Sequence, residues 1–275
     1  MDRLAISPQC GFASVMLGNE TTEDAQWRKA RAAREGRRAP VVGPRDGAER
    51  GPLRVLVLKP QELSRTGHVG VSLRDRGVEV VEHVLADDGE PPALEGFDAI
   101  VVTGAPWSVD GAEVRPWLDG LLARLRESVA LDVPVLGICF GAQAFAQATG
   151  GWVARARDTE VGLREVETDD PTLVPSGPWF MWHGDTFGPP DGATVIARTE
   201  AGPQAYTLGP HLLVQFHPEA TAHMVEAWLA YDDSDFHRAG LDSDETLRAI
   251  VRGERAAHER ADALVGRFLE GVGAT

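Results

Sequence analysis

Short apolar runs alternate with amphipathic stretches between residues 53 and 150. Four of the runs, 53–58, 77–85, 97–104 and 133–139, predict buried parallel strands because they are apolar on both faces. The helical spacing of apolar residues between these runs predicts helices over 62–76, 114–130 and 141–150. This order predicts an α/β fold with a central, mostly parallel sheet and helices on both faces.

The pattern changes from Trp152 onward, where short apolar runs follow one another closely with turn residues between them. Such spacing predicts antiparallel or mixed strands. The predicted strands are 152–156, 161–167, 180–185, 193–199, 205–209 and 212–217. Two helices, about 221–231 and 243–270, close the chain. Apolar residues at helical spacing predict that the last helix packs on the core, namely Leu247, Ile250, Val251, Ala257, Ala261, Leu264 and Phe268.

The first 50 residues differ from the rest in charge. They carry nine Lys/Arg and seven Asp/Glu, whereas the remainder of the chain carries 18 and 35. Residues 36–52 are rich in proline, glycine and charge and show no apolar period, which is typical of a linker. We therefore expect two parts: an N-terminal extension with its linker over 1–52, and one α/β domain with a C-terminal helix over 53–275.

Net charge, hydropathy and cysteine content exclude several classes of function. A formal charge of −15 argues against binding to nucleic acid or to an anionic membrane surface, because both partners need a positive footprint. The sequence has no apolar run long enough to span a membrane and no signal-peptide pattern, so we expect a cytoplasmic protein. The two cysteines, Cys10 and Cys139, are expected to be reduced thiols.

Cys139 lies where a predicted strand meets a predicted helix, in the run GICFG. Glycines two residues before and after it allow a sharp turn that lifts the side chain out of the sheet, as in a nucleophile elbow. The helix N-terminus favours the thiolate, and the N–H of Phe140 would point at the same place, ready to hold an oxyanion. A buried core cysteine also fits this pattern, so a nucleophile needs a base elsewhere in the chain.

The run QFHPEA supplies such a base at the end of another predicted strand. In an extended segment, His217 and Glu219 project to the same side, and Pro218 fixes the chain between them. The carboxylate can then hold one imidazole nitrogen and leave the other for a thiol, which is the order of nucleophile, base and orienting acid. A surface turn is the alternative for HPE alone. The presence of GxCxG at a second strand end argues against it.

With these motifs, region 53–231 resembles the class I, triad-type glutamine amidotransferases. It is most similar to stand-alone members related to the glutaminase domain of GMP synthases. TGAPWSVDG (103–111) resembles the oxyanion loop, GICFGAQ (137–143) the nucleophile motif and VQFHPE (214–219) the base motif, while WHGDTFGPPDGATVIA (182–197) resembles a signature of the stand-alone group. The resemblance implies a flavodoxin-like fold with the site above the C-terminal ends of the strands.

The resemblance also implies residue roles. Cys139 is expected to be the nucleophile, His217 the base and Glu219 its orienting acid, and the backbone N–H groups of Gly104 and Phe140 would form the oxyanion hole. The expected substrate-binding residues are Gln143, His183, Asp185 and Trp107. A hydrogen-bonded structural turn is an equal alternative for His183 and Asp185, and Trp107 and Trp182 could be ordinary core or loop aromatics.

The implied reaction is cleavage of the γ-carboxamide of glutamine, or of a related γ-glutamyl compound, through a γ-glutamyl thioester without metal or cofactor. Ammonia or an amine would leave, and water or another amine would accept the γ-glutamyl group. The chain could instead donate ammonia to a separate synthetase, or be a non-catalytic binding or assembly protein that keeps the fold. Relatives commonly carry a Glu-hydrophobic-Gly-Trp run, but TEVGLRE has Leu163 at the tryptophan position.

Residues 4–35 do not fit this family. They resemble the C-terminal tail of the cobalamin-independent methionine synthases, and Cys10 stands at the position of a zinc-binding cysteine. A catalytic zinc site needs about three protein ligands, and the barrel that would provide the others has no counterpart in this sequence. We therefore expect no zinc chemistry and regard the segment as an extension of unknown role.

Overall fold

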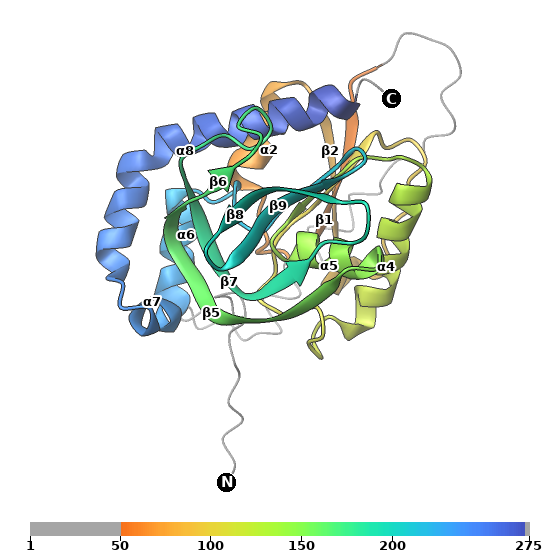
Figure 1. The fold of residues 1–275 in the computed structure, drawn as a ribbon. Helices are drawn as coiled ribbons and strands as arrows, with labels where there is room; N and C mark the ends of the chain where they lie inside the picture. Colours follow the sequence, from red (N-terminus) through yellow and green to blue (C-terminus); the bar gives the residue numbers. More distant parts are fainter. Residues whose placement is uncertain (1–50, 273–275) are drawn as a thin grey trace, which may run out of the picture.

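A computed structural model describes residues 51–272 (Figure 1). Cys10, the 4–35 segment and most of the predicted linker lie outside the described residues. An eight-stranded sheet in the order β2-β1-β3-β4-β10-β9-β8-β6 forms the centre of the fold. Its strands are β1 (Arg54–Lys59), β2 (Glu79–Val84), β3 (Ala99–Val102), β4 (Val135–Ile138), β6 (Glu167–Thr168), β8 (Thr194–Thr199), β9 (Gly202–Leu208) and β10 (His211–Val214).

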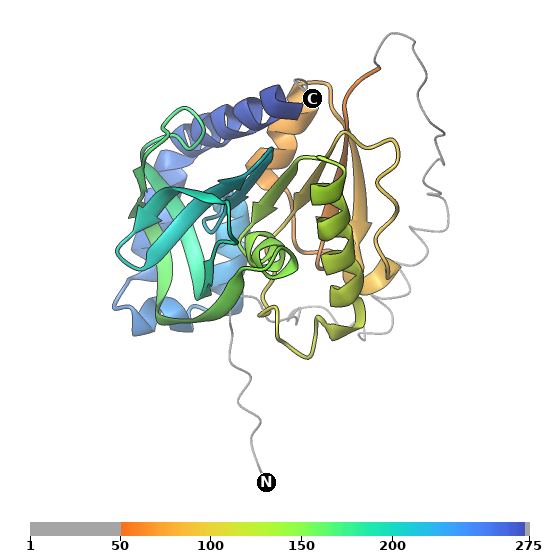
Figure 2. The same ribbon diagram turned by 45° about the vertical axis from the view of Figure 1, so that its right-hand side comes forward.

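The sheet is parallel from β2 to β10 and antiparallel beyond it, as the change in the sequence pattern predicts. Helices α2 (Gly67–Asp75) and α8 (Ser243–Val272) cover one face, and α4 (Arg115–Ala130) and α5 (Phe140–Ala148) cover the other (Figures 1 and 2). Successive side chains of β1 point to opposite faces of the sheet and so pack in both layers. Val55 lies in the apolar cluster of α2 and α8, and Leu56 lies in that of α4 and α5.

A two-stranded antiparallel ribbon of β5 (Trp152–Glu165) and β7 (Pro178–Gly188) lies beside the main sheet. A third apolar cluster joins this ribbon to α6 (Ala222–Tyr231), α7 (Ser234–Arg238) and α8, and it is rich in aromatic rings such as Phe180, Trp182 and Trp228. A short helix, α3 (Leu85–Asp88), follows β2. In the part of the chain that the structure describes, no helix is both long and apolar enough to cross a lipid bilayer.

The predicted α/β class and most elements are confirmed, but several boundaries were wrong. The run 152–156 and most of the run 161–167 form one strand, β5, interrupted by a register shift between Arg155 and Glu160. Glu167 instead pairs with β8, together with Thr168, as β6. The first helix begins at Gly67 rather than at 62. The short helices α3 and α7 were not predicted.

Two burial predictions were also wrong. Strand β2 is not buried on both faces, because it is the edge of the sheet and exposes residues such as Glu79 and Glu82. On α8, Ile250, Ala261, Leu264 and Phe268 are buried as predicted, but Val251 is 58% exposed. Val251 follows directly after the buried Ile250, and neighbouring residues of a helix point in directions about 100° apart.

The junction between β4 and α5 depends on close contact between a helix and a strand backbone. A Cβ added to Gly141 would lie 2.3 Å from the carbonyl oxygen of Val102 in β3. A Cβ on Gly137 would lie 2.8 Å from Leu213 Cδ1 and 2.9 Å from the carbonyl carbon of Gly141. The two glycines therefore allow the first turn of α5 to pack directly on the sheet.

We predict that Gly141→Ala lowers the free energy of unfolding by about 1–3 kcal/mol, because strand backbone cannot move away from the new methyl group as a flexible side chain could. Urea denaturation followed by circular dichroism measures this change. Gly253→Ala is the matched control. That glycine lies within α8 with nothing near its added Cβ, so alanine should stabilise the protein by about 1 kcal/mol. Equal stability of wild type and Gly141→Ala would contradict the packing argument.

Candidate active site

Cys139 occupies the turn between β4 and α5 in a conformation that few non-glycine residues adopt. Its φ is 49° and its ψ is −104°. Its N–H donates to Val214 O at 2.8 Å, and its carbonyl oxygen accepts from Gln143 N at 3.1 Å, so the backbone is held from both sides. Such a torsion costs about 1–3 kcal/mol and persists only where the surroundings impose it.

The unusual torsion falls on Cys139 itself, whereas Gly137 and Gly141 both have ordinary negative φ values. We had expected these glycines to supply the sharp turn. Their contribution is instead the absence of a Cβ, which lets α5 approach the sheet. Cys139 forms no disulfide bond within residues 51–272 and is fully buried.

The predicted base and orienting acid contact each other directly. His217 Nδ1 lies 2.7 Å from Glu219 Oε1, and both side chains are almost completely buried. The backbone N–H of His217 donates to Phe180 O at 2.9 Å, and its ring packs edge-on against Trp228 at a centroid distance of 5.6 Å. Strand β7 and helix α6 therefore fix the imidazole between them, with Nδ1 committed to Glu219.

The surroundings of His217 favour its charged form. Burial alone would lower the pKa of His217, but Glu219 and Cys139 outweigh burial and raise the pKa well above its ordinary value. After Glu219, Cys139 is the second group that raises this pKa. An imidazolium held between a carboxylate and a sulfur atom is the arrangement expected for a thiolate–imidazolium pair.

The N-terminus of α2 supports the segment that carries Glu219. This contact was not predicted from the sequence. His68 N donates to Glu219 O at 3.1 Å. A Cβ on Gly67 would lie only 1.8 Å from that same oxygen, and Gly67 also has a φ of +41°, so only glycine fits here. The His68 ring in turn faces Glu254 of α8 at 3.4 Å. The only sequence signal is Gly67 in the run TGHVG. Nothing in the local sequence pattern relates this glycine to residue 219.

Gly104, the predicted oxyanion-hole residue, lies beside the side chains of Cys139 and His217. A Cβ at this position would be 3.0 Å from His217 Cε1 and 3.6 Å from Cys139 Cβ. Phe140 is the first residue of α5, directly after Cys139. Both peptide groups named for the oxyanion hole are thus next to the thiol, one on the loop after β3 and the other at a helix N-terminus.

Gln143 lies one turn after Cys139 and is fully buried. Its Nε2 donates to Gln215 Oε1 at 3.3 Å and approaches Asp185 O at 3.5 Å. Nothing among the described residues hydrogen-bonds its Oε1. A buried acceptor without a partner is costly, and such atoms are often completed by a ligand or water.

His183 and Asp185 form a second buried polar group on β7. His183 Nδ1 is 3.0 Å from Asp185 O, and its Nε2 is 3.3 Å from Glu160 Oε2. Burial raises the pKa of Asp185, which Ser108 and Arg155 offset only in part. The loop residue Ser108 thus connects this group to the predicted oxyanion loop.

Glu160 is a residue of this group that the sequence reasoning missed. Burial would raise the pKa of Glu160, but the nearby His183 ring and hydrogen bonds from Thr199 and Gln204 lower it overall, so the carboxylate is charged. Thr199 Oγ1 and Gln204 Nε2 lie 2.9 Å and 2.5 Å from its two oxygens. The available sequence signal was that Glu160 is the first glutamate of the run TEVGLRE.

The two tryptophans expected near the pocket differ in their surroundings. Trp107 is half-buried and packs against the cluster of α4 and α5. Trp182 is buried among aromatic rings of the third cluster, and its Nε1 donates to Asp235 Oδ2 at 3.0 Å. Trp182 is therefore a core residue of the third cluster.

Comparison with known proteins agrees with this geometry. The family model described as glutamine amidotransferase class-I matches residues 66–229. The chain belongs to the class-I glutamine amidotransferase family, and its α/β architecture is the flavodoxin-like fold of that family.

Curated relatives include GMP synthases and a shorter protein. The chain is 33% identical to the glutamine-hydrolysing GMP synthase of Phenylobacterium zucineum, over 73% of this chain and 39% of that protein. It is 35% identical to that of Corynebacterium jeikeium, over 51% of this chain and 27% of that protein. It thus spans about a third of these synthases. A glutamine amidotransferase-like protein of Salmonella typhimurium is 26% identical, over 71% of this chain and 87% of that protein.

Solved structures include a glutamine amidotransferase from Methylobacillus flagellatus. It is 27% identical to this chain, with a TM-score of 0.73 over 80% of this chain and 96% of the other. A glutamine amidotransferase from Thermotoga maritima is 24% identical and has the same TM-score over 80% of this chain and all of its own, which supports the fold alone.

We predict that Glu219→Gln lowers the pKa of His217, because the substitution removes the negative charge that favours the imidazolium. In the wild type the ring should stay protonated as pH rises past 6.5, and in the variant it should lose its proton at lower pH. Titration of the ring Cε1–H signals by NMR measures both values. His211, whose pKa burial lowers to about 4, is the internal control and should not change. An unchanged His217 titration would contradict the assigned pairing.

Proposed function

We propose that this protein is a cysteine-dependent amidase that cleaves the γ-carboxamide of glutamine, or of a closely related γ-glutamyl compound. The observation that carries the proposal is the 2.7 Å contact of Glu219 with His217 beside the strained Cys139. Nucleophile, base and orienting acid come from the ends of two adjacent parallel strands, β4 and β10. This is the order of groups that acyl transfer through a thiol requires.

The reaction follows from the protonation states. The Cys139 thiolate attacks the γ-carbonyl carbon, and the N–H groups of Gly104 and Phe140 stabilise the oxyanion. His217 gives its proton to the nitrogen, which leaves as ammonia when the C–N bond breaks, and a γ-glutamyl thioester remains on the sulfur. His217 then takes a proton from water, which attacks the thioester and releases glutamate together with the thiolate.

The residues proposed to hold the substrate are Gln143, His183, Asp185 and Trp107. Oε1 of Gln143 is a buried acceptor without a hydrogen-bond partner among the described residues, so it suits the α-ammonium group of glutamine.

The fate of the ammonia separates two forms of the proposal. We infer that the ammonia is either released into solvent or delivered to a separate acceptor enzyme. Donation to a synthetase is supported by the GMP synthase relatives, of which this chain matches only about a third. Free-standing hydrolysis or transfer of the γ-glutamyl group is supported by the similarity to a relative covered over 87% of its length. The buried His217–Glu219 pair argues against a purely structural role, because a buried ion pair is retained at a cost.

We predict glutamate release from glutamine by the wild-type protein and none by Cys139→Ala, measured with a coupled glutamate dehydrogenase assay. Glu219→Gln should lower kcat by several orders of magnitude, because the imidazole loses its orientation and charge. Glu226→Gln removes an exposed carboxylate on α6 and serves as the matched control with unchanged kcat.

Other γ-glutamyl amides assayed in parallel define the substrate. Release from such an amide, but not from glutamine, would make the protein a specialised γ-glutamyl hydrolase or transferase. Glutamate release that survives in Cys139→Ala would refute the amidase proposal. The proposal would also be refuted if the wild-type protein cleaved none of these substrates, either alone or together with a synthetase.

A further inference from the structure

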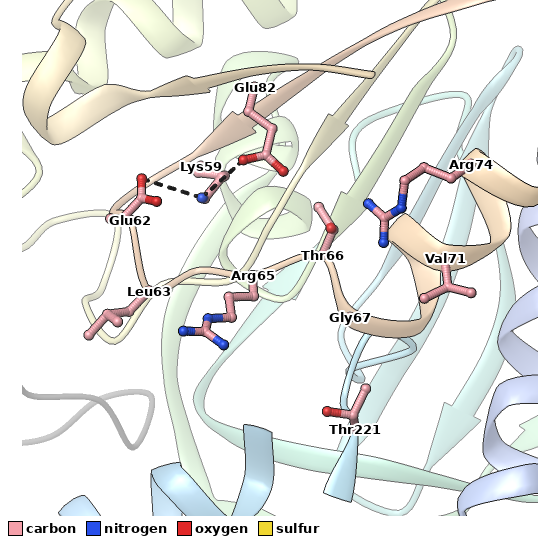
Figure 3. A pocket seen from close by; sticks show the side chains of 10 residues that line it. All are labelled: Lys59, Glu62, Leu63, Arg65, Thr66, Gly67, Val71, Arg74, Glu82 and Thr221. Atoms are coloured by element: carbon pink, nitrogen blue, oxygen red, sulfur yellow. Dashed lines mark hydrogen bonds and ion pairs between the residues drawn. The ribbon is translucent and has the colours of Figure 1, made fainter. Parts of the chain in front are cut away.

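A pocket of about 500 Å³ opens beside the N-terminus of α2, away from the triad. It lies at the C-terminal ends of β1 and β2, the side of an open α/β sheet where ligands bind. Figure 3 shows the side chains that line it: Lys59, Glu62, Leu63, Arg65, Thr66, Gly67, Val71, Arg74, Glu82 and Thr221. None of them belongs to the triad or to the proposed glutamine site.

Positive charge in this pocket contrasts with the acidic chain around it. Arg65 and Arg74 are exposed, and within residues 51–272 neither forms an ion pair. Lys59 is only 4% exposed and lies between Glu82 at 3.2 Å and Glu62 at 3.5 Å, as the dashed lines in Figure 3 mark. A protein with a net charge of −15 repels anions in general. Two neighbouring guanidinium groups without ion-pair partners among the described residues make this pocket a local exception to that repulsion.

Thr66 provides a second and independent observation. Its side chain is 93% buried yet lines the pocket, and it occupies the N-cap position of α2 without capping the helix. Its hydroxyl has no hydrogen-bond partner among the described residues. Thr66 is a good capping residue that leaves its hydroxyl unused, which suits a group that a ligand completes.

The absence of a side chain at Gly70 brings these groups together. A Cβ at Gly70 would lie 2.1 Å from Thr66 Oγ1 and 3.2 Å from Arg74 Nη1. Arg74 therefore turns back along α2 toward its N-terminus, where the helix dipole also favours negative charge. Glycine within a helix costs about 1 kcal/mol relative to alanine, and here it leaves the space in which the hydroxyl and the guanidinium lie.

We propose that this pocket is a binding site for a small anionic molecule that carries a carboxylate or a phosphate group. Arg65 and Arg74 would hold the anion with their planar guanidinium groups, and the Thr66 hydroxyl would donate a hydrogen bond. Lys59 is already neutralised by Glu62 and Glu82 and is not part of the proposed anion contacts. The exposed side chains of Leu63 and Val71 at the same pocket would contact an apolar part of the ligand. The volume suits a metabolite-sized molecule.

The pocket also adjoins the segment that carries Glu219. Thr221 lines the pocket two residues after Glu219, and Gly67 touches the Glu219 carbonyl. A bound anion would therefore contact the same turn of α2 that supports the orienting acid. The binding itself is independent of the amidase proposal, since no lining residue takes part in the reaction.

Isothermal titration calorimetry on the full 275-residue chain tests the site, with inorganic phosphate and benzoate as separate probes. We expect one probe to bind at one site per chain, and the probe that binds identifies phosphate or carboxylate as the recognised group. Arg65→Ala/Arg74→Ala should weaken binding at least about tenfold, and Thr66→Val several-fold. The matched control, Arg248→Ala/Arg252→Ala, removes two exposed arginines of α8 and should bind as the wild type does.

Failure of both probes to bind would overturn the proposal. Equal weakening in the pocket variant and the control would also overturn it, because general charge attraction would then explain the binding. Circular dichroism spectra confirm that the variants are folded. Because the readout is direct binding, the result does not depend on glutamine hydrolysis and stands apart from the glutamate-release assay.

Discussion

The left-handed backbone conformation of Cys139 is the constraint on which the rest of this structure depends. A strained torsion is stable only where its neighbours leave no alternative. Here the Cys139 N–H is bound by Val214 of β10, while Gly141 brings α5 into contact with the backbone of β3. The parallel pairing of β3, β4 and β10 thus imposes the torsion that places the thiol at a helix N-terminus.

The same organisation extends outward to the helices. Glu219 orients His217, α2 supports Glu219, and α8 holds α2 through Asp262, which accepts a hydrogen bond from Ser72 at 2.8 Å. Arg76 also pairs with Asp262 and lowers the pKa of this acid to about 2. The long C-terminal helix is therefore part of the support of the candidate site, although it contributes no residue to the triad.

Local pattern predicted most of the elements and the motifs of the candidate site, because these signals are contiguous in sequence. The apolar runs of β1, β3 and β4 and the motifs around Cys139 and His217 each lie within a few residues. The contact of Gly67 with Glu219 could not be predicted, because it joins residues about 150 positions apart through the topology of the sheet. The same holds for the hydrogen bonds of Glu160 with Thr199 and Gln204.

The errors in element boundaries have a comparable origin. Residues 157–160 are polar and charged, which suggested a loop between two strands. Pairing with β7 on either side of this stretch instead continues β5 through it, with a shift in register. Likewise, the apolar spacing before Gly67 suggested a longer helix. A helix that began at 62 would not leave the turn in which Gly67 approaches Glu219. In both cases a tertiary contact overrides local preference.

Covalent trapping tests the central claim, that Cys139 is a nucleophile activated by His217 and Glu219, most directly. The full-length protein is incubated with a glutamine analogue that carries an electrophilic diazoketone in place of the carboxamide, and the modified peptide is identified by mass spectrometry. The account predicts one adduct per chain, on Cys139, and a much slower reaction in Glu219→Gln. An adduct on Cys10 alone, or an equal rate in Glu219→Gln, would contradict it.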